Sequence, residues 1–424
     1  MIQKIKNKIK GKENLVSNIF SLFILQGANF ILPLISLPYL VRVLEIDNFG
    51  LVMFAQAFIM YFIIITDYGF NMSATREISI NKEDKQKISL IFSTVMMIKI
   101  GLILLSFLLL SLVVFSFEKF SSNWQIYYLT FGIVIGQSLF PIWFFQGMEK
   151  MKYITILNII AKLIFTVSIF IFVIHKEDYL YVPILNSLGF IVAGLLSLYI
   201  VFSQFSLRLV KPNWSYSKEI FKDSSSLFVS NLSVSLYTAS NTFILGLFTN
   251  NATVGIYASI EKLVLAIKNL YTPLYQALFP WLSQKSNQEI KLKIKKLILP
   301  ILLFSSLVTI VLYIYAKDML ELIFNQEGIT NYYMVFQIMA FISIFASLNM
   351  LFNMLYLTSV KAYKERMTIM ISAGIFNISI VTLLTFKYSL YGTAIGITLT
   401  ELFLLLFGIY YWKNNIKINK ELND

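Results

Sequence analysis

Seven ionisable side chains lie within long apolar stretches of the sequence, where a charge is costly. A charged group inside a membrane span costs about 2.5–3.5 kcal/mol on insertion scales, so such groups usually face a bundle interior or a wet cavity. Lysine presents a compact positive charge that binds phosphate, and a buried carboxylate usually pairs with a positive charge. The seven residues are Asp67, Lys99, Lys162, Glu261, Lys262, Lys268 and Glu401.

The excess of lysines among these residues predicts a water-filled, positively charged cavity for an anionic substrate such as a phosphate or pyrophosphate. Glu261 and Lys268 are seven residues apart and share a helix face, which we expect to line this cavity. An ion pair between spans, joining a lysine to Asp67 or Glu401, stays open as the alternative. The cavity cations in this interpretation are Lys99, Lys162, Lys262 and Lys268, and the cavity acids are Asp67, Glu261 and Glu401.

The sequence offers little for other kinds of chemistry. It has no cysteine, which excludes disulfides, thiolate chemistry and cysteine metal sites. Its one histidine, His175, stands in a short charged loop, and no nucleophile–histidine set or carboxylate pair occurs in a plausible outside loop. A Gly-x-x-x-x-Gly-Lys-Ser/Thr run for binding nucleotide phosphates is also missing. We therefore expect no catalytic residue, no metal and no cofactor.

The elements that carry these residues are twelve apolar stretches, each reaching the ~20 residues that a helix needs to cross ~30 Å of hydrocarbon. Apolar residues make up 58% of the chain and charged residues only 13%, against about 25% charged in soluble domains. The stretches are 15–40, 50–72, 88–117, 125–146, 153–174, 180–203, 224–248, 254–283, 297–316, 332–359, 367–386 and 391–412.

Positive charge alternates from loop to loop. The N-terminus, every second loop and the C-terminus together hold 26 lysines and arginines, and the intervening loops hold 5. The positive-inside rule places the first set, with both termini, in the cytoplasm. Because the net charge of +13 follows this topology rather than one basic face, we expect no nucleic-acid partner. The predicted fold is an all-α polytopic membrane protein with twelve transmembrane helices.

The longest loop, about residues 204–223, divides the spans into two sets of six. Residues 21–50 and 226–255 both open with Ser-Leu-Phe and both close with an apolar residue and glycine, at a constant offset of 205. Six plus six spans with the same orientation form a parallel repeat. We expect a six-helix lobe over residues 1–210 and a second over residues 211–424, around a central cavity that suits alternating access.

Three stretches resemble the polysaccharide (O-antigen) flippases. That family shares a superfamily with multidrug and toxin extrusion transporters and lipid II flippases. The first stretch runs from Gln26 to Arg42 and is followed by Phe49-Gly50, the second runs from Asp67 to Ser79, and the third from Pro141 to Lys152. The second half resembles the family less, mainly at Asn241, at Gly255-Ile-Tyr257 and at Phe279-Pro280. The motif positions are Gln26, Asn29, Pro33, Pro38, Arg42, Arg76, Trp143, Gln146 and Asn241.

The resemblance implies that an undecaprenyl-diphosphate-linked oligosaccharide moves from the cytoplasmic to the periplasmic leaflet of the bacterial inner membrane. The intramembrane lysines would bind the diphosphate or acidic sugars, and the acids would carry a coupling cation. The expected partners are the lipid-linked oligosaccharide, membrane lipids, and the polysaccharide polymerase with its chain-length machinery. Lipopolysaccharide biosynthesis is the pathway in which such a flippase acts.

Two other functions compete with this interpretation. A cation-coupled multidrug exporter of the same superfamily should have an acidic cavity, whereas the intramembrane charges here are mainly basic. A membrane-embedded glycan polymerase or ligase typically needs a large outside loop with catalytic polar residues. The longest outside loop here, about residues 317–331, is too short to hold one.

Overall fold

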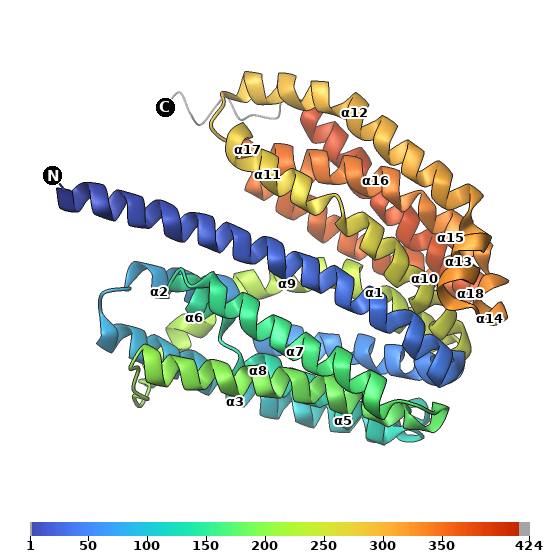
Figure 1. Cartoon of the computed structure of the whole chain (residues 1–424), viewed down its shortest axis with the longest axis horizontal. Helices are drawn as coiled ribbons and strands as arrows, with labels where there is room; N and C mark the ends of the chain where they lie inside the picture. The colour runs from blue at the N-terminus through green and yellow to red at the C-terminus, as the bar shows by residue number, and fades with distance from the viewer. Residues whose placement is uncertain (1, 415–424) are drawn as a thin grey trace. The chain divides into compact units, whose positions relative to one another are not determined.

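The computed structural model describes residues 2–414, and it is helical throughout with no strand in that range (Figure 1). Within the helices, the side chains of most residues up to 31, of several between 226 and 239, and of Pro280 are left undescribed. Eight helical segments of this range are long and apolar enough to cross a membrane. The prediction of an all-α, multi-pass membrane protein is confirmed, and the count of twelve crossings stays a prediction.

The longer helices carry most of the chain. They are α1 (Ile2–Asp67), α3 (Lys85–Ser116), α5 (Trp124–Leu139), α7 (Met151–Phe172), α8 (Tyr181–Gln204), α9 (Trp214–Phe248), α10 (Asn251–Asn269), α12 (Asn287–Ile314) and α18 (Tyr363–Lys413). Shorter helices are α2 (Phe70–Ile80), α4 (Glu118–Ser121), α6 (Ile142–Gly147), η1 (Lys176–Leu180), α11 (Thr272–Leu282), α13 (Ala316–Phe324), α14 (Glu327–Thr330), α15 (Tyr333–Ala340), α16 (Ile342–Asn349), η2 (Met350–Tyr356) and α17 (Leu357–Ser359).

Two of the long helices contain a break in the backbone. In α1, Glu45 has φ 60° and ψ 169°, and in α18, Ser389 has φ 50° and ψ −131°. A side chain other than glycine rarely adopts a positive φ, so each break is a sharp turn between two helical pieces. Both breaks fall in the short segments that the sequence analysis placed between neighbouring spans. Each of these helices therefore supplies two of the predicted apolar stretches.

Large apolar side chains point outward along the long helices, as expected of a surface in contact with lipid. On α3, Leu104, Leu108 and Leu112 are each more than 60% exposed and recur every fourth residue on one face. On α12, Leu299 and Leu303 repeat the pattern. In water such stripes would be unstable, whereas hydrocarbon is their natural solvent.

The described chain divides into two compact units. The first consists of residues 1–36 and 55–232, and the second of residues 37–54 and 233–424. The lobe boundaries expected from the sequence, 1–210 and 211–424, stay a prediction. Residues 37–54 contribute to the second unit although the chain on both sides of them belongs to the first.

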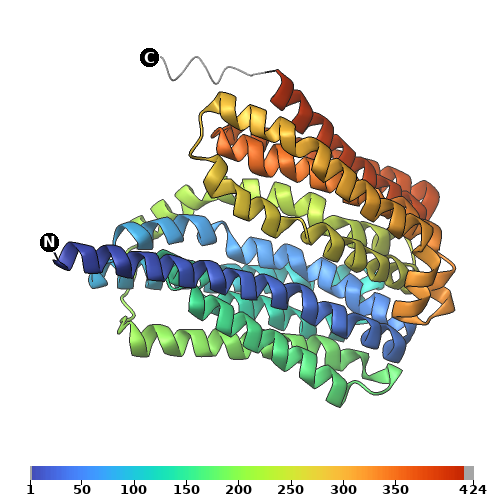
Figure 2. The same cartoon turned by 45° about the horizontal axis from the view of Figure 1, so that its top comes forward.

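In the first unit, α5 and α8 pack closely through small residues. A Cβ atom at Gly136 would lie 2.5 Å from the Phe190 backbone, and one at Gly194 would lie 2.8 Å from the Gly136 carbonyl oxygen. The Ser187 hydroxyl donates a hydrogen bond of 2.7 Å to the Leu129 carbonyl oxygen. Helix pairs in membranes associate in this way because apolar burial gives no preference over lipid. Figures 1 and 2 both show α7 alongside α8.

In the second unit, residues 37–54 are fixed against α10 and α13. A Cβ atom at Gly50 would lie 1.8 Å from the Asn251 carbonyl oxygen, and one at Gly255 would lie 2.2 Å from the Ile46 carbonyl oxygen. Glycine is therefore required at both positions, because the backbones approach too closely for a side chain. The two contacts mirror each other, since Ile46 and Gly50 each precede their counterparts by 205 residues.

Candidate functional site

The intramembrane charges of the first unit lie on α1, α3 and α7. Lys99 is only 4% exposed, and the carboxylate of Asp67 at the end of α1 exerts an electrostatic attraction on it. The Asp67 carboxylate also accepts a hydrogen bond from the Gly69 backbone N–H. Asp67 therefore has a positive neighbour and a backbone donor, so this part of the site is electrostatically balanced.

Lys162, on α7, differs from Lys99 in having no counter-charge. Its side chain is half-buried, and no carboxylate with a described side chain lies within ion-pair distance of its ammonium group. The alternative considered for this lysine was an ion pair with Asp67 or Glu401. Glu401 pairs with another lysine, and Asp67 interacts with Lys99. The positive charge of Lys162 is thus available for an anion.

In the second unit, Lys268 of α10 forms a buried ion pair with Glu401 of α18. The distance between Lys268 Nζ and Glu401 Oε1 is 2.5 Å, and the two side chains are 14% and 3% exposed. Asn349 donates a hydrogen bond of 3.0 Å from its Nδ2 atom to Glu401 Oε2. Both carboxylate oxygens therefore have partners, as a buried charge requires. The sequence left two interpretations open for Lys268, a cavity cation or an ion pair between spans. The geometry fits the ion pair.

Asn353 extends this network toward the backbone of α18. Its Nδ2 atom donates a hydrogen bond of 2.6 Å to Asn349 Oδ1 and one of 2.8 Å to the Leu404 carbonyl oxygen. Asn353 lies in η2, a π-helical segment that directly follows α16. Such π-helical turns inside helices are frequent at functional sites. The network therefore fixes the orientation of the Glu401 carboxylate through protein groups alone.

A second buried carboxylate, that of Glu261, has hydroxyl partners instead of a lysine. Thr242 donates to its Oε2 atom at 2.8 Å, and Tyr257 donates to its Oε1 atom at 3.0 Å. The neighbouring Lys262 is exposed and acts on Glu261 as a nearby positive charge, although no ion pair joins the two among the described contacts. The sequence therefore identified seven intramembrane charges, and the structure arranges them in four different environments.

Two motif positions of the first half, Trp143 and Gln146, contribute packing and hydrogen-bond contacts. Trp143 is fully buried in the core of the first unit. The Thr75 hydroxyl lies 2.7 Å from the Asn71 carbonyl oxygen, 3.1 Å from the Trp143 carbonyl oxygen and 3.3 Å from Gln146 Oε1, so it joins α2 to α6. Arg76 is exposed on α2. These contacts hold the second and third motifs together inside the first unit.

The first motif lies along α1. Arg42 donates from Nε to the Phe324 carbonyl oxygen and from a second guanidinium nitrogen to the Ile323 carbonyl oxygen, both at 2.9 Å. A positive charge at the carbonyl end of a helix is favourable, so Arg42 caps α13. Pro33 is exposed and Pro38 is half-buried. The side chains of Gln26 and Asn29 lie outside the described residues.

Sequence reasoning missed the neutral partners of the buried acids. Thr242, Tyr257 and Asn349 each bind a carboxylate, yet none was a candidate. Tyr257 could have been found, because it precedes Glu261 by one helical turn and must lie on the same face. Thr242 and Asn349 belong to other helices than the acids they bind, so no spacing in the sequence reveals them.

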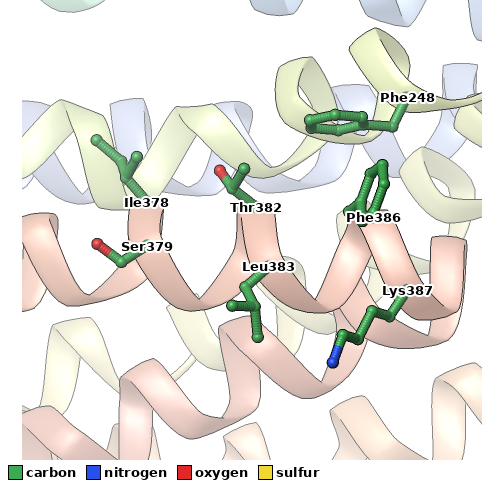
Figure 3. Close-up of a pocket in the computed structure, with 7 residues that line it drawn as sticks. All are labelled: Phe248, Ile378, Ser379, Thr382, Leu383, Phe386 and Lys387. Carbon is green, nitrogen blue, oxygen red and sulfur yellow. The ribbon is translucent and has the colours of Figure 1, made fainter.

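An open groove of about 490 Å³ lies between the end of α9 and the first part of α18. Figure 3 shows Phe248 of α9 facing Phe386 of α18, with ring centroids 5.9 Å apart. The groove is also lined by Ile378, Ser379, Thr382, Leu383 and Lys387. The groove contains none of the seven intramembrane charges, so it is separate from the candidate site. Among the side chains that the structure describes, no group of three or more His, Cys, Asp or Glu could hold a metal ion.

Solved structures identify the class of fold. A multidrug resistance MATE family transporter of the MOP superfamily, in an inward-facing conformation, matches with a TM-score of 0.70 at 13% identity, over 91% of this chain and 94% of that chain. The lipid II flippase MurJ in its inward closed conformation matches with a TM-score of 0.68 at 12% identity, over 93% of this chain and 87% of that chain. The chain therefore has the fold of the MOP-superfamily transporters.

The sequence identifies the family more closely. Residues 15–286 match the family described as "Polysaccharide biosynthesis protein". A "Putative O-antigen transporter" of Escherichia coli (strain K12) is 28% identical over 95% of this chain and 98% of its own length. A protein of the same name from Shigella dysenteriae is 28% identical over 92% of this chain and 98% of its own length. This chain belongs to the polysaccharide biosynthesis protein family, which confirms the resemblance seen in its motifs.

Proposed function

We propose that the protein moves a lipid-linked polysaccharide unit of the O-antigen type across the membrane, from the cytoplasmic to the periplasmic leaflet. The observation that carries this proposal is the match, over nearly the whole chain, to relatives named as O-antigen transporters. A lipid diphosphate is anionic, and Lys162 offers a positive charge within a predicted span that no described carboxylate neutralises. That charge gives the substrate a binding group inside the membrane.

The wider setting follows from the same proposal. The protein acts in the bacterial cytoplasmic membrane by alternating access, with both termini in the cytoplasm as the loop charges predict. Transport rather than catalysis is its activity, and the lipid-linked oligosaccharide is its substrate. A polysaccharide polymerase with its chain-length machinery would receive the unit on the periplasmic side.

A cation-coupled multidrug exporter is the second candidate, because the fold is shared with a multidrug transporter. A cationic drug would meet the like charge of Lys162, which disfavours its binding. A glycan polymerase or ligase is less well supported still. The outside segment near residues 317–331 is mostly taken up by the two short helices α13 and α14, which leaves little room for a catalytic loop.

Transport by the purified protein in liposomes tests the proposal. The substrate is a short polyprenyl-diphosphate oligosaccharide with a fluorescent sugar, and transport is its protection from a membrane-impermeant quencher. Lys162→Gln should lower the rate about 10–100-fold, since a hydrogen bond to a charged group contributes about 1.5–3 kcal/mol. Lys162→Arg keeps the charge and should retain more activity. Lys152→Gln, at an exposed position of the same helix, is the matched control.

Two results would contradict the proposal. Equal movement of the labelled lipid in liposomes with and without the protein would remove the flippase function. Transport of a cationic dye with no movement of the lipid would favour the exporter instead. Full activity of Lys162→Gln would leave the function intact but would exclude this lysine from substrate binding, and Lys99 would be the next cation to test.

A further inference from the structure

The groove at the end of α9 is formed by Phe248 and by three successive turns of α18, from Ile378 to Lys387 (Figure 3). All of these residues belong to the second unit. Ser379 and Thr382 have small side chains, which leave a hollow that larger residues would fill. The lining is apolar except for two hydroxyl groups and one lysine, so the groove suits an apolar chain. Its volume of about 490 Å³ falls within the range of about 300–1,000 Å³ typical of ligand sites.

The groove reaches the surface of the membrane at its Lys387 end. Helix α9 ends at Phe248, and the first piece of α18 ends at the turn at Ser389. Lys387 and Tyr388, just before that turn, are both exposed. Lysine and tyrosine are typical of the boundary between hydrocarbon and water. From Ile378 to Lys387 the helix rises about 14 Å, which matches the depth of about 15 Å that one leaflet contributes to the hydrocarbon.

Lys387 is the only charged residue that lines the groove. No carboxylate with a described side chain lies within ion-pair distance of its ammonium group. A lysine at this depth attracts the negative headgroups of membrane lipids. The groove therefore combines an apolar channel one leaflet deep with a positive charge at the level of the headgroups.

We propose that the groove binds one acyl chain of an anionic phospholipid, whose headgroup phosphate contacts Lys387. The predicted topology places residues 387–390 outside the cytoplasm, so the lipid comes from the outer leaflet of this membrane. A zwitterionic headgroup carries an ammonium group of its own, which would bring a like charge toward Lys387 and disfavour its binding. The site holds a lipid of the surrounding membrane, and its existence does not depend on what the protein transports.

Two other occupants fit the groove less well. The polyprenyl chain of a lipid-linked substrate is much longer than one leaflet is deep, whereas the groove ends after three helical turns. A second copy of this chain would need small residues along the contact, because helices in membranes approach each other closely through such residues. The groove instead carries the large side chains of Phe248, Leu383 and Phe386, which are all exposed.

Photo-crosslinking of the purified protein in phosphatidylcholine nanodiscs tests the site. The probes are phosphatidylglycerol and phosphatidylcholine with the same diazirine in one acyl chain, and mass spectrometry identifies the labelled peptides. Phosphatidylglycerol should label residues 378–387 about fivefold more than phosphatidylcholine, the preference that one lysine at a membrane surface confers. Both probes should label the exposed Leu104 and Leu108 of α3 equally, since that surface lies along the middle of a span.

Four variants separate the charge from the groove. Lys387→Gln should reduce labelling by phosphatidylglycerol to the level of phosphatidylcholine, and Lys387→Arg should keep the excess. Ser379→Leu fills part of the hollow and should lower labelling by both probes. Lys364→Gln removes an exposed lysine near the other end of the same helical piece and should change neither result.

Three results would overturn the proposal. Equal labelling of residues 378–387 by the two probes in the parent protein would remove the preference for an anionic lipid, and an undiminished excess in Lys387→Gln would exclude the lysine as its cause. Displacement of the phosphatidylglycerol probe by an equimolar polyprenyl phosphate would assign the groove to the transported lipid. An unlabelled groove in particles that contain two copies of the chain would assign it to a dimer contact.

Discussion

Replacement of Lys268 by methionine should destabilise the protein, because it leaves a buried carboxylate without its cation. The Glu401 side chain is 3% exposed, and after the change its remaining partner among the described side chains is Asn349. Removal of one member of a buried ion pair costs about 3–5 kcal/mol. For a unit of roughly 150–250 residues, 3 kcal/mol corresponds to about 6–12 °C in melting temperature. Intrinsic fluorescence during heating in detergent measures the shift.

The double variant Lys268→Met with Glu401→Gln should recover most of the lost stability. The glutamine amide oxygen can accept the Asn349 hydrogen bond, and neither uncompensated charge remains. Lys364→Met, at an exposed lysine on the same helix as Glu401, serves as the control and should change stability by no more than about 0.5 kcal/mol. A double variant that loses as much stability as the two single variants combined would refute the reasoning, since the charges would then not be coupled.

The same variants separate structure from substrate binding. If Lys268 acts mainly on Glu401, the double variant recovers transport together with stability, and this is the result we expect. A double variant that folds and melts like the parent protein but does not transport would instead assign Lys268 to the substrate. Protein abundance in the membrane has to be measured alongside transport, so that loss of folding is not mistaken for loss of function.

Three further predictions concern the packing and the topology of the chain. Gly50→Ala should destabilise the protein by about 1–3 kcal/mol through overpacking, whereas Gly101→Ala, with nothing within 4 Å of the added Cβ, should not; equal melting temperatures would contradict this. Arg42→Lys should lower stability by about 1 kcal/mol, because an ammonium group cannot reproduce both guanidinium hydrogen bonds, and an unchanged melting temperature would exclude the cap. Because this chain has no cysteine, single cysteines report the topology. An impermeant thiol reagent, added to whole cells with a permeable outer membrane, should label Glu177→Cys and leave Ser215→Cys unlabelled. Labelling of both would overturn the predicted topology.

The class of fold could be predicted from the sequence because two independent patterns agree. Hydrophobic length identifies the spans, and the basic loops orient them. The turns at Glu45 and Ser389 fall where these patterns placed loops, although the helix continues on both sides of each turn. Burial in hydrocarbon acts on every residue of a span, so the signal is strong and local.

The arrangement of the charges could be predicted only in part. Lys268 and Glu401 are 133 residues apart, and nothing in either segment indicates that they meet. Tyr257 and Glu261 are a single turn apart, and their contact follows from helical geometry. The assignment of residues 37–54 to the second unit was also beyond reach, because it depends on backbone contacts with α10 and α13 that leave no periodic pattern.

The crossing of residues 46–50 with residues 251–255 has a consequence for the ancestry of the chain. In a six-span ancestor that assembled as a symmetric pair, one glycine would have met the backbone of its own twin, and a single substitution would have introduced two clashes at once. In the present chain the two glycines are encoded separately, and each faces backbone atoms of the other segment. A clash caused by a side chain at one of these positions cannot be relieved at the other, because the glycine there has no side chain to lose. We therefore expect related sequences to keep glycine at both positions, Gly50 and Gly255.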